Sequence, residues 1–215
     1  MQKKTYAVLG LGRYGTAVAK ELVKNGADVI AVDKNEQIVQ DSSVYLPICK
    51  CADITDPEVI SELGISNADV VIVAMASSLE GSILAITLCK EAGVKTVIAK
   101  CANETHRKIL KRVGADTVVF PENESGTRLA KNLLTSGFTD ILTLSDDLSL
   151  VELAARDEWV DKSLKELNLR KKYTVNVVAF RKNGKITAPV NPEELLDKDT
   201  EIIAIVNTAK LSKLK

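Results

Sequence analysis

The sequence predicts an α/β protein in which a doubly wound parallel sheet is followed by a smaller α+β domain. Two observations support this prediction. Runs that are apolar throughout alternate with helix-like segments over residues 5–120, which is typical of parallel strands covered by helices on both faces. After about Ser136 the segments become shorter and include a hairpin, so we expect domains at 1–135 and 136–215.

The first domain is expected to contain six strands separated by helices. The expected strands are short and apolar, and they cover residues 5–9, 29–32, 48–51, 70–74, 96–100 and 117–120. Helices are expected between them at 13–24, at 35–43, from Pro57, at 78–92 and at 104–113. Gly26 ends the first helix. Pro57 suits the first position of its helix, because the N–H that proline lacks would have no partner there.

The second domain is expected to be an α+β unit of roughly 75 residues, close to the lower size limit for a stable domain. Strands at 175–181 and 185–187 flank Asn183-Gly184, a pair typical of a type I′ hairpin turn. A helix at 162–169 and a strand at 201–206 complete it. Pairing with a second copy would add stability to so small a domain.

Composition favours a folded cytoplasmic protein. The chain has 215 residues, 46% of them hydrophobic, and its 29 acidic and 29 basic residues cancel. This balance disfavours a nucleic-acid partner, which requires a basic surplus. The longest apolar run, 70–76, is far shorter than the roughly 20 residues of a membrane helix, and the first residues do not resemble a signal peptide.

A glycine-rich loop follows the first expected strand and suggests a Rossmann-like nucleotide site. Gly10, Gly12 and Gly15 form a GxGxxG pattern between a strand and a helix, and Asp33 ends the second strand. In this arrangement the glycines allow a tight turn, close approach of a pyrophosphate and helix–strand packing, while the carboxylate binds ribose hydroxyls and repels a 2′-phosphate. The alternative is a glycine turn needed only for packing.

Charged residues are expected beside this loop. Arg13, which precedes Tyr14 inside the loop, could bind a terminal phosphate or a neighbouring subunit instead of facing only solvent. Lys100 and Glu122 each follow an expected strand, at the sheet edge where ligands bind. Glu122 is a candidate ligand of a divalent cation beside phosphates, and the alternative is an exposed loop acid.

Motifs for catalysis are missing from the sequence, so we expect a binding protein instead of an enzyme. The single histidine, His106, lies among basic residues of an expected helix, and there is no GxSxG elbow or Walker loop. The four cysteines lack zinc-site spacing and are expected to be reduced and largely buried. An NAD(H)-dependent oxidoreductase and an NAD(H)-binding redox sensor remain alternatives.

Longer stretches of the sequence resemble a known family. They are similar to the cytosolic RCK (KTN) regulators of Ktr and Trk potassium uptake systems, of the single-repeat Ktr type. The stretches are VLGLGRYGTAVAKELVKNGADVIAVDKNEQIV, CADITD, DVVIVAMAS, VIAKCAN, GADTVVFPENESGTRLAKNL and LNLRKKYTVNVVAF. The resemblance implies a homo-octamer built from dimers, docked at the cytoplasmic face of the membrane on a potassium-translocating subunit.

The resemblance also implies ligands. ATP or ADP would occupy the Rossmann site, whereas NAD or NADH is associated with the Trk branch. The loop glycines, Arg13 and Lys100 would contact phosphates, with Arg13 reaching across the dimer interface. Asp33 would hold the ribose and Asp53 would lie near the adenine, while Glu122 would bind a divalent cation between protomers.

A second ligand, cyclic di-AMP, is implied for the carboxyl domain at its dimer interface. Arg170 and Asn176 match polar positions of that site, and Pro192 borders it.

Overall fold

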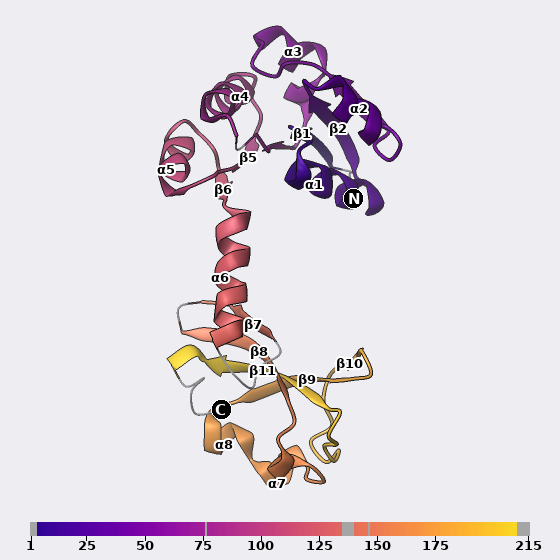
Figure 1. Ribbon diagram of the computed structural model, residues 1–215, viewed down its shortest axis with the longest axis vertical. Coiled ribbons are helices and arrows are strands. Elements are labelled where there is room, and N and C mark those ends of the chain that lie inside the picture. The colour runs from indigo at the N-terminus through magenta and orange to yellow at the C-terminus, as the bar shows by residue number, and fades with distance from the viewer. Residues whose placement is uncertain (1–3, 76, 135–139, 146, 210–215) are drawn as a thin grey trace. The chain divides into compact units, whose positions relative to one another are not determined.

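The computed structural model describes residues 4–75, 77–134, 140–145 and 147–209 (Figure 1). The chain divides into two compact units, and the division falls between Glu122 and Asn123. Within the described residues, no helix is both long enough and apolar enough to span a membrane.

The first unit contains the expected parallel sheet, with strand order β3-β2-β1-β4-β5-β6. All neighbouring strands run parallel. Because the chain moves outward from β1 first in one direction and then in the other, the carboxyl ends of β1 and β4 form a switch point, where ligands bind in such sheets. The strands are β1 (Thr5–Leu9), β2 (Asp28–Asp33), β3 (Ile48–Cys51), β4 (Val70–Val73), β5 (Thr96–Lys100) and β6 (Thr117–Val119).

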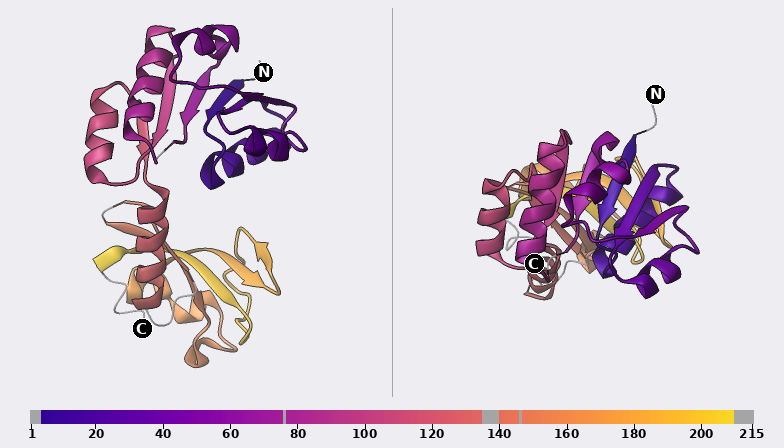
Figure 2. Two further views of the ribbon diagram at one scale, coloured as in Figure 1. Left: turned by 45° about the horizontal axis from the view of Figure 1, so that its top comes forward. Right: turned by 90° about the horizontal axis from the view of Figure 1, so that it is seen from above.

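Helices cover both faces of this sheet (Figure 2). Val8 and Leu9 of β1 are both fully buried although neighbouring residues of a strand point to opposite faces, so each face has its own core. Residues of α3, α4 and α5 pack on one face and residues of α1 and α2 on the other. The helices are α1 (Arg13–Lys24), α2 (Glu36–Ser42), α3 (Pro57–Glu62), α4 (Leu79–Glu91) and α5 (Glu104–Arg112), with a short 3₁₀ helix at Ile65–Asn67.

The amino ends of α2 to α5 are stabilised by the chain itself. Each is preceded by a side chain that accepts a hydrogen bond from a backbone N–H of the first turn, and each carries a glutamate in that turn. Helix α1 differs, because Gly12 precedes it, no side chain caps it and its first turn contains no acid. Its positive end is therefore available to an external anion. The capping residues of α2 to α5 are Asn35, Asp56, Ser78 and Asn103, and the acids are Glu36, Glu58, Glu80 and Glu104.

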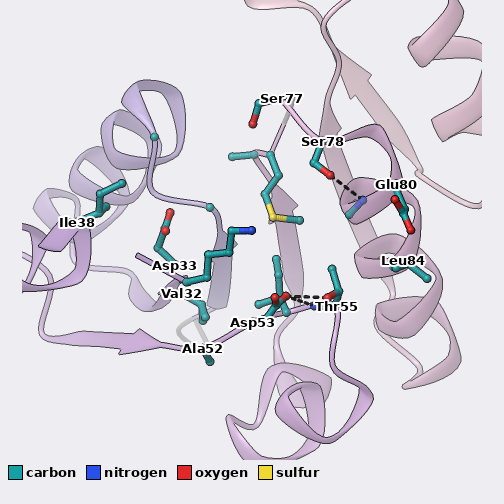
Figure 3. Close-up of a pocket in the computed structure, with 17 residues that line it drawn as sticks. Val32, Asp33, Ile38, Ala52, Asp53, Thr55, Ser77, Ser78, Glu80 and Leu84 are labelled. Atoms are coloured by element: carbon teal, nitrogen blue, oxygen red, sulfur yellow. Dashed lines mark hydrogen bonds between the residues drawn. The ribbon is translucent and has the colours of Figure 1, made fainter. Parts of the chain in front are cut away.

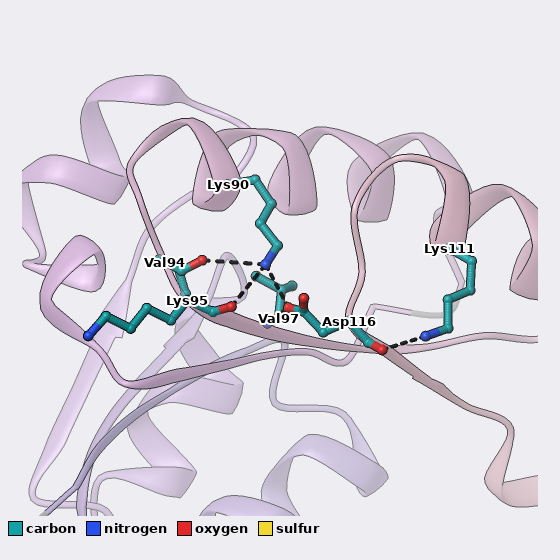
Figure 4. A network of polar contacts seen from close by, with 6 residues as sticks. All are labelled: Lys90, Val94, Lys95, Val97, Lys111 and Asp116. Atoms are coloured by element: carbon teal, nitrogen blue, oxygen red, sulfur yellow. Dashed lines mark hydrogen bonds and ion pairs between the residues drawn. The ribbon is translucent and has the colours of Figure 1, made fainter.

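A polar network closes the amino edge of the sheet, opposite the switch point (Figure 4). The Lys90 ammonium donates to the Asp116 carboxylate at 2.6 Å and to the Val94 carbonyl at 3.4 Å. The same carboxylate accepts the Val97 N–H at 2.6 Å, and Lys111 donates to the Asp116 carbonyl. The hydrogen bond from Lys90 is the main reason why the pKa of Asp116 lies below its ordinary value.

The helix α6 (Pro121–Leu134) begins at the last residues of the first unit. Its first turn contains Glu122, so this residue is helical and does not lie in a loop. Proline suits the first position of a helix, which explains why the helix begins directly at Pro121.

The second unit is an antiparallel sheet with strand order β10-β9-β11-β8-β7. The predicted hairpin is confirmed, because Asn183 and Gly184 have φ values of 50° and 75°, as a type I′ turn requires. Two strands of this sheet, β7 and β8, were not predicted. The strands are β7 (Asp140–Thr143), β8 (Leu148–Ala154), β9 (Asn176–Lys182), β10 (Lys185–Thr187) and β11 (Glu201–Asn207).

The prediction of a single helix at 162–169 is wrong, because the structure has two short helices in this region. Ser163 and Glu166 form a capping box that starts α7 (Leu164–Leu167), and Asn168, with φ 50°, interrupts the helix before α8 (Leu169–Tyr173). Asparagine tolerates this left-handed conformation better than most residues. A short 3₁₀ helix at Asp157–Trp159 precedes these helices, and Trp159 belongs to the core of the unit.

The expectation of largely buried cysteines holds for two of the four. Cys89 and Cys101 are buried, and burial raises the pKa of the Cys89 thiol to about 12. Cys49 is partly buried and Cys51 is exposed, because both lie on the edge strand β3.

We expect Asp116→Asn to lower the free energy of unfolding by about 1 kcal/mol at neutral pH relative to the unchanged protein. The amide oxygen of asparagine can still accept a hydrogen bond, but the negative charge of the carboxylate is lost. The pKa of Asp116 is lowered in the folded state, so its contribution is present above the unfolded pKa of about 3.9 and is lost as the pH falls through the folded value. Denaturant titrations at neutral and acidic pH measure this, with the exposed Asp199→Asn variant as control. A difference that stays constant with pH would contradict it.

Candidate functional site

A cavity of about 460 Å³ opens at the switch point of the parallel sheet (Figure 3). It lies where β1, β2 and β4 end, and residues that follow β3 complete it. The lining residues are Gly10, Gly12, Val32, Asp33, Lys34, Ile38, Ala52, Asp53, Ile54, Thr55, Ala74, Met75, Ser77, Ser78, Glu80, Gly81 and Leu84.

The three glycines of the loop are needed for different reasons. Gly10 has φ 96°, and a Cβ atom there would lie 2.8 Å from the Met75 side chain. A Cβ atom at Gly15 would lie 1.9 Å from the Gly10 carbonyl oxygen. At Gly12, by contrast, no atom of the described chain, apart from Gly12 and its two chain neighbours, lies within 4 Å of the added Cβ. Folding therefore requires the first and third glycines, whereas the space at Gly12 is open to a ligand.

The loop is held in place by hydrogen bonds on both sides. The Leu11 N–H donates to Asp33 Oδ2 at 2.7 Å, and the Thr16 hydroxyl donates to the Leu11 carbonyl at 2.7 Å. These bonds fix the backbone at the uncapped end of α1. Because the helix dipole is positive at this end, the arrangement suits a phosphate group.

Asp33 contacts the protein through both carboxylate oxygens. Oδ2 accepts the Leu11 N–H, and Oδ1 accepts the Asn35 N–H at 2.9 Å. A carboxylate offers about four acceptor positions, so lone pairs remain for the hydroxyl groups of a ribose. Asp33 can thus position the loop and bind a ligand at the same time.

Asp53 lies on the part of the cavity wall that follows β3. Its Oδ1 atom accepts the Thr55 hydroxyl at 2.7 Å and the Thr55 N–H at 3.0 Å. The hydroxyl bond is the main reason why the pKa of Asp53 is lowered, and the carboxylate is ionised at neutral pH.

Four residues predicted to surround the phosphates cluster beside the cavity without lining it. The Lys100 ammonium lies 2.5 Å from Glu122 Oε1 and 5.5 Å from the centre of the Tyr14 ring. The pKa of Glu122 is lowered, mainly by the hydrogen bond from Lys100 and to a smaller extent by the charge of Arg13. Lys100 and Glu122 were expected to lie at the same edge of the sheet, and in the structure they form a direct ion pair.

This pairing does not by itself make a cation site. The charge of Glu122 is balanced by an ammonium group, and no group of three or more His, Cys, Asp or Glu residues that could hold a metal exists in the described part of the chain.

Several lining residues were not identified from the sequence. Lys34 follows β2, whereas Ser77, Ser78 and Glu80 follow β4. Their signal was present, since polar residues directly after parallel strands lie at the edge where ligands bind. His106 lies on α5 and does not line the cavity.

The residues expected to bind cyclic di-AMP lie on three segments of the second unit. Arg170 is in α8, Asn176 begins β9 and Pro192 lies between β10 and β11. All three are exposed. The Pro192 carbonyl accepts the Lys165 N–H at 3.0 Å, which ties its segment to α7.

Comparison with known proteins agrees with this architecture. The TrkA-N domain family matches residues 6–121, and the TrkA-C domain family matches residues 148–215. Ktr system potassium uptake protein C of Bacillus subtilis is 34% identical over 213 residues, which is 99% of this chain and 96% of that protein. Ktr system potassium uptake protein A of Vibrio alginolyticus is 33% identical, over 99% of this chain and 97% of that protein.

Among solved structures, the GsuK channel covers 99% of this chain with a TM-score of 0.73 and 17% identity, and the chain covers 39% of it. The GsuK RCK domain gives a TM-score of 0.68 at 17% identity, over 99% of this chain and 47% of that one. At this identity the likeness shows a shared fold. The sequence matches go further, because they extend along the whole chain at more than 30% identity. The chain therefore belongs to the family of TrkA-N/TrkA-C proteins that includes the Ktr system potassium uptake proteins, as its sequence resemblance predicted.

Proposed function

We propose that this protein is a nucleotide-binding regulatory subunit of a membrane potassium uptake system, with ATP or ADP in the cavity of its first unit. The observation that carries the proposal is the amino end of α1, which alone among α1 to α5 has neither a side-chain cap nor a first-turn acid. It opens into a cavity that also holds a carboxylate suited to ribose.

The nucleotide is oriented by these groups. Its phosphates lie at Gly12 and the N–H groups of α1, because those offer the positive charge. The ribose hydroxyls donate to Asp33, and the adenine lies toward Asp53. Gly12, Asp33 and Asp53 all belong to the cavity wall, and α1 begins directly after Gly12.

The relatives are named as potassium uptake proteins, and this supports a partner that carries the ion. We propose that the partner is a membrane-embedded potassium-translocating subunit, with this chain bound at its cytoplasmic face. In this proposal residues 1–135 form the nucleotide domain and residues 136–215 the carboxyl domain, and neither contacts nucleic acid.

Assembly with further copies is supported by α6. None of its described side chains is buried, and Leu129, Leu133 and Leu134 are 60%, 78% and 81% exposed. Three exposed leucines on one helix favour association, since burying each one removes apolar surface from water. We propose that a second copy covers them and that dimers build an octameric ring.

Such a ring would respond to the nucleotide by linkage. A ligand shifts an assembly only as far as it binds two arrangements with different affinity. Arg13 is exposed at the start of α1, close enough to lower the pKa of Glu122, and in a dimer its guanidinium could meet the terminal phosphate of the partner's nucleotide. No bond is broken, so ATP acts as an effector and not as a substrate.

Two further ligands belong to the same proposal. A divalent cation at Glu122 requires that the Lys100 ammonium move away, for example toward bound phosphates, and that a second chain or the nucleotide supply more oxygen atoms. Cyclic di-AMP would bind at Arg170, Asn176 and Pro192 between two carboxyl domains.

NAD(H) is the second candidate for the cavity. A solved structure of the GsuK channel bound to NAD has the same fold, with a TM-score of 0.68, and this favours testing the dinucleotide here. A thermal-shift panel of ATP, ADP, NAD and NADH ranks the candidates, because a ligand of the folded state raises the melting temperature. Substrate-dependent oxidation of NADH would reveal an oxidoreductase instead.

We expect Gly12→Ala to leave the melting temperature within about 2 °C of the original, because the added methyl group meets open space. It should nevertheless lower nucleotide affinity at least about tenfold, since the methyl group occupies the place of the phosphates. Isothermal titration measures the affinity, and Gly126→Ala in α6, also in open space, is the matched control. Unchanged nucleotide binding by Gly12→Ala would contradict the proposed site.

We expect Arg13→Ala to lower the ratio of ATP affinity to ADP affinity by about fivefold, because only the terminal phosphate loses a charge-assisted hydrogen bond. The affinity for adenosine should stay the same. Titrations of the three ligands give the ratio. Lys24→Ala, in the last turn of the same helix, is the control. An equal loss of affinity for ATP and ADP would remove Arg13 from this role.

We expect Leu133→Lys to weaken self-association at least about tenfold, because a buried ammonium cannot replace a leucine in an apolar contact. Analytical ultracentrifugation over a concentration series measures this. Val44→Lys replaces an apolar residue of the first unit that is 85% exposed, and it should have no such effect. Identical sedimentation of Leu133→Lys and the unchanged protein would mean that α6 is not the interface.

A further inference from the structure

Two helix ends of opposite character meet at the cavity. Gly12 brings the uncapped end of α1 to its wall, and Ser78, Glu80 and Gly81 bring the start of α4. At α4 the Ser78 hydroxyl accepts the Gly81 N–H at 3.1 Å, and the Glu80 carboxylate lies in the first turn. The cap and the acid offset part of the positive end of α4, so this end attracts a phosphate less than the uncapped end of α1 does.

The carboxylates of the cavity differ in their surroundings. Asp33 and Asp53 each accept two hydrogen bonds from the protein, which spread their charge. Glu80 is exposed. No hydrogen bond from the described part of the chain to its carboxylate is found. Figure 3 shows Glu80 and Asp33 on opposite sides of the cavity.

The net charge of the described lining residues is negative. Asp33, Asp53 and Glu80 contribute three carboxylates, and Lys34 contributes one ammonium group. A phosphate that binds at α1 is thus attracted by the helix end but repelled by a carboxylate of the facing wall. The repulsion grows with each negative charge of the ligand and does not act on a neutral nucleoside.

We infer that Glu80 is a specificity-determining residue that makes the affinity of the cavity fall as the negative charge of the nucleotide rises. This inference rests on the proposed function, because it concerns the same ligand class. It assigns the two walls different tasks: α1 attracts phosphate, and Glu80 limits how much anionic charge is accepted.

The test is the Glu80→Gln variant, which keeps the shape of the side chain and removes its charge. Adenosine, ADP and ATP are titrated calorimetrically in buffer that contains EDTA, so that no divalent cation masks the phosphates. ATP affinity should rise about three- to tenfold, ADP affinity should rise less, and adenosine affinity should stay within about twofold. High salt should reduce these gains, because dissolved ions screen the repulsion between exposed charges.

Glu36→Gln is the matched control. Glu36 is also the exposed first-turn acid of a helix next to the cavity, but it does not line the wall. Glu36→Gln removes one negative charge from the protein and one acid from the first turn of a helix, as Glu80→Gln does. It therefore controls for the change in net charge and for the change in helix stability. Equal gains with Glu36→Gln, equal gains for adenosine and ATP, or a loss of ATP affinity in Glu80→Gln would each overturn the inference. If the unchanged protein binds none of the three ligands, the proposed function itself fails.

Discussion

The hydrogen bond from the Leu11 N–H to the Asp33 carboxylate joins the glycine loop to the end of β2, and the site depends on this bond. It holds the turn in which Gly10 adopts a positive φ and Gly15 packs against the Gly10 carbonyl. That packing directs the amino end of α1 into the cavity. Without the hydrogen bond from Leu11, the amino end of α1 would lose its direct link to the Asp33 carboxylate.

The two units bury their apolar residues in different ways. The first covers both faces of a parallel sheet with its own helices, and its strands are nearly fully buried. The second has a core around Trp159, Phe180 and Ile202, while the leucines of α6 remain exposed. The exposed apolar side chains of α6 are therefore the surface that our proposal covers with a second copy.

Much of the fold could be predicted because its signals are local. The glycine loop, Asp33 and the Asn183-Gly184 turn each depend on residues close together in the sequence. The break at Asn168 could not be predicted, because a left-handed asparagine looks like any polar residue of a helix. The wall formed by Ser78 and Glu80 was missed for another reason. Their position after a parallel strand places them at the ligand-binding edge, but only the sheet order shows that the start of α4 faces Asp33. Lys100 and Glu122 were expected at this edge, and the structure adds that they form an ion pair.

The open space at Gly12 has an evolutionary consequence. Because this glycine is not required by the fold, a family member could replace it and remain a stable scaffold. Under the proposed function, such a member would lose its nucleotide. Replacement of Gly15 has no such outcome, since the clash with the Gly10 carbonyl would disturb the loop itself. Under the proposed function, selection for nucleotide binding acts on Gly12 and selection for folding acts on Gly15, so a lineage that no longer uses the nucleotide should change Gly12 first.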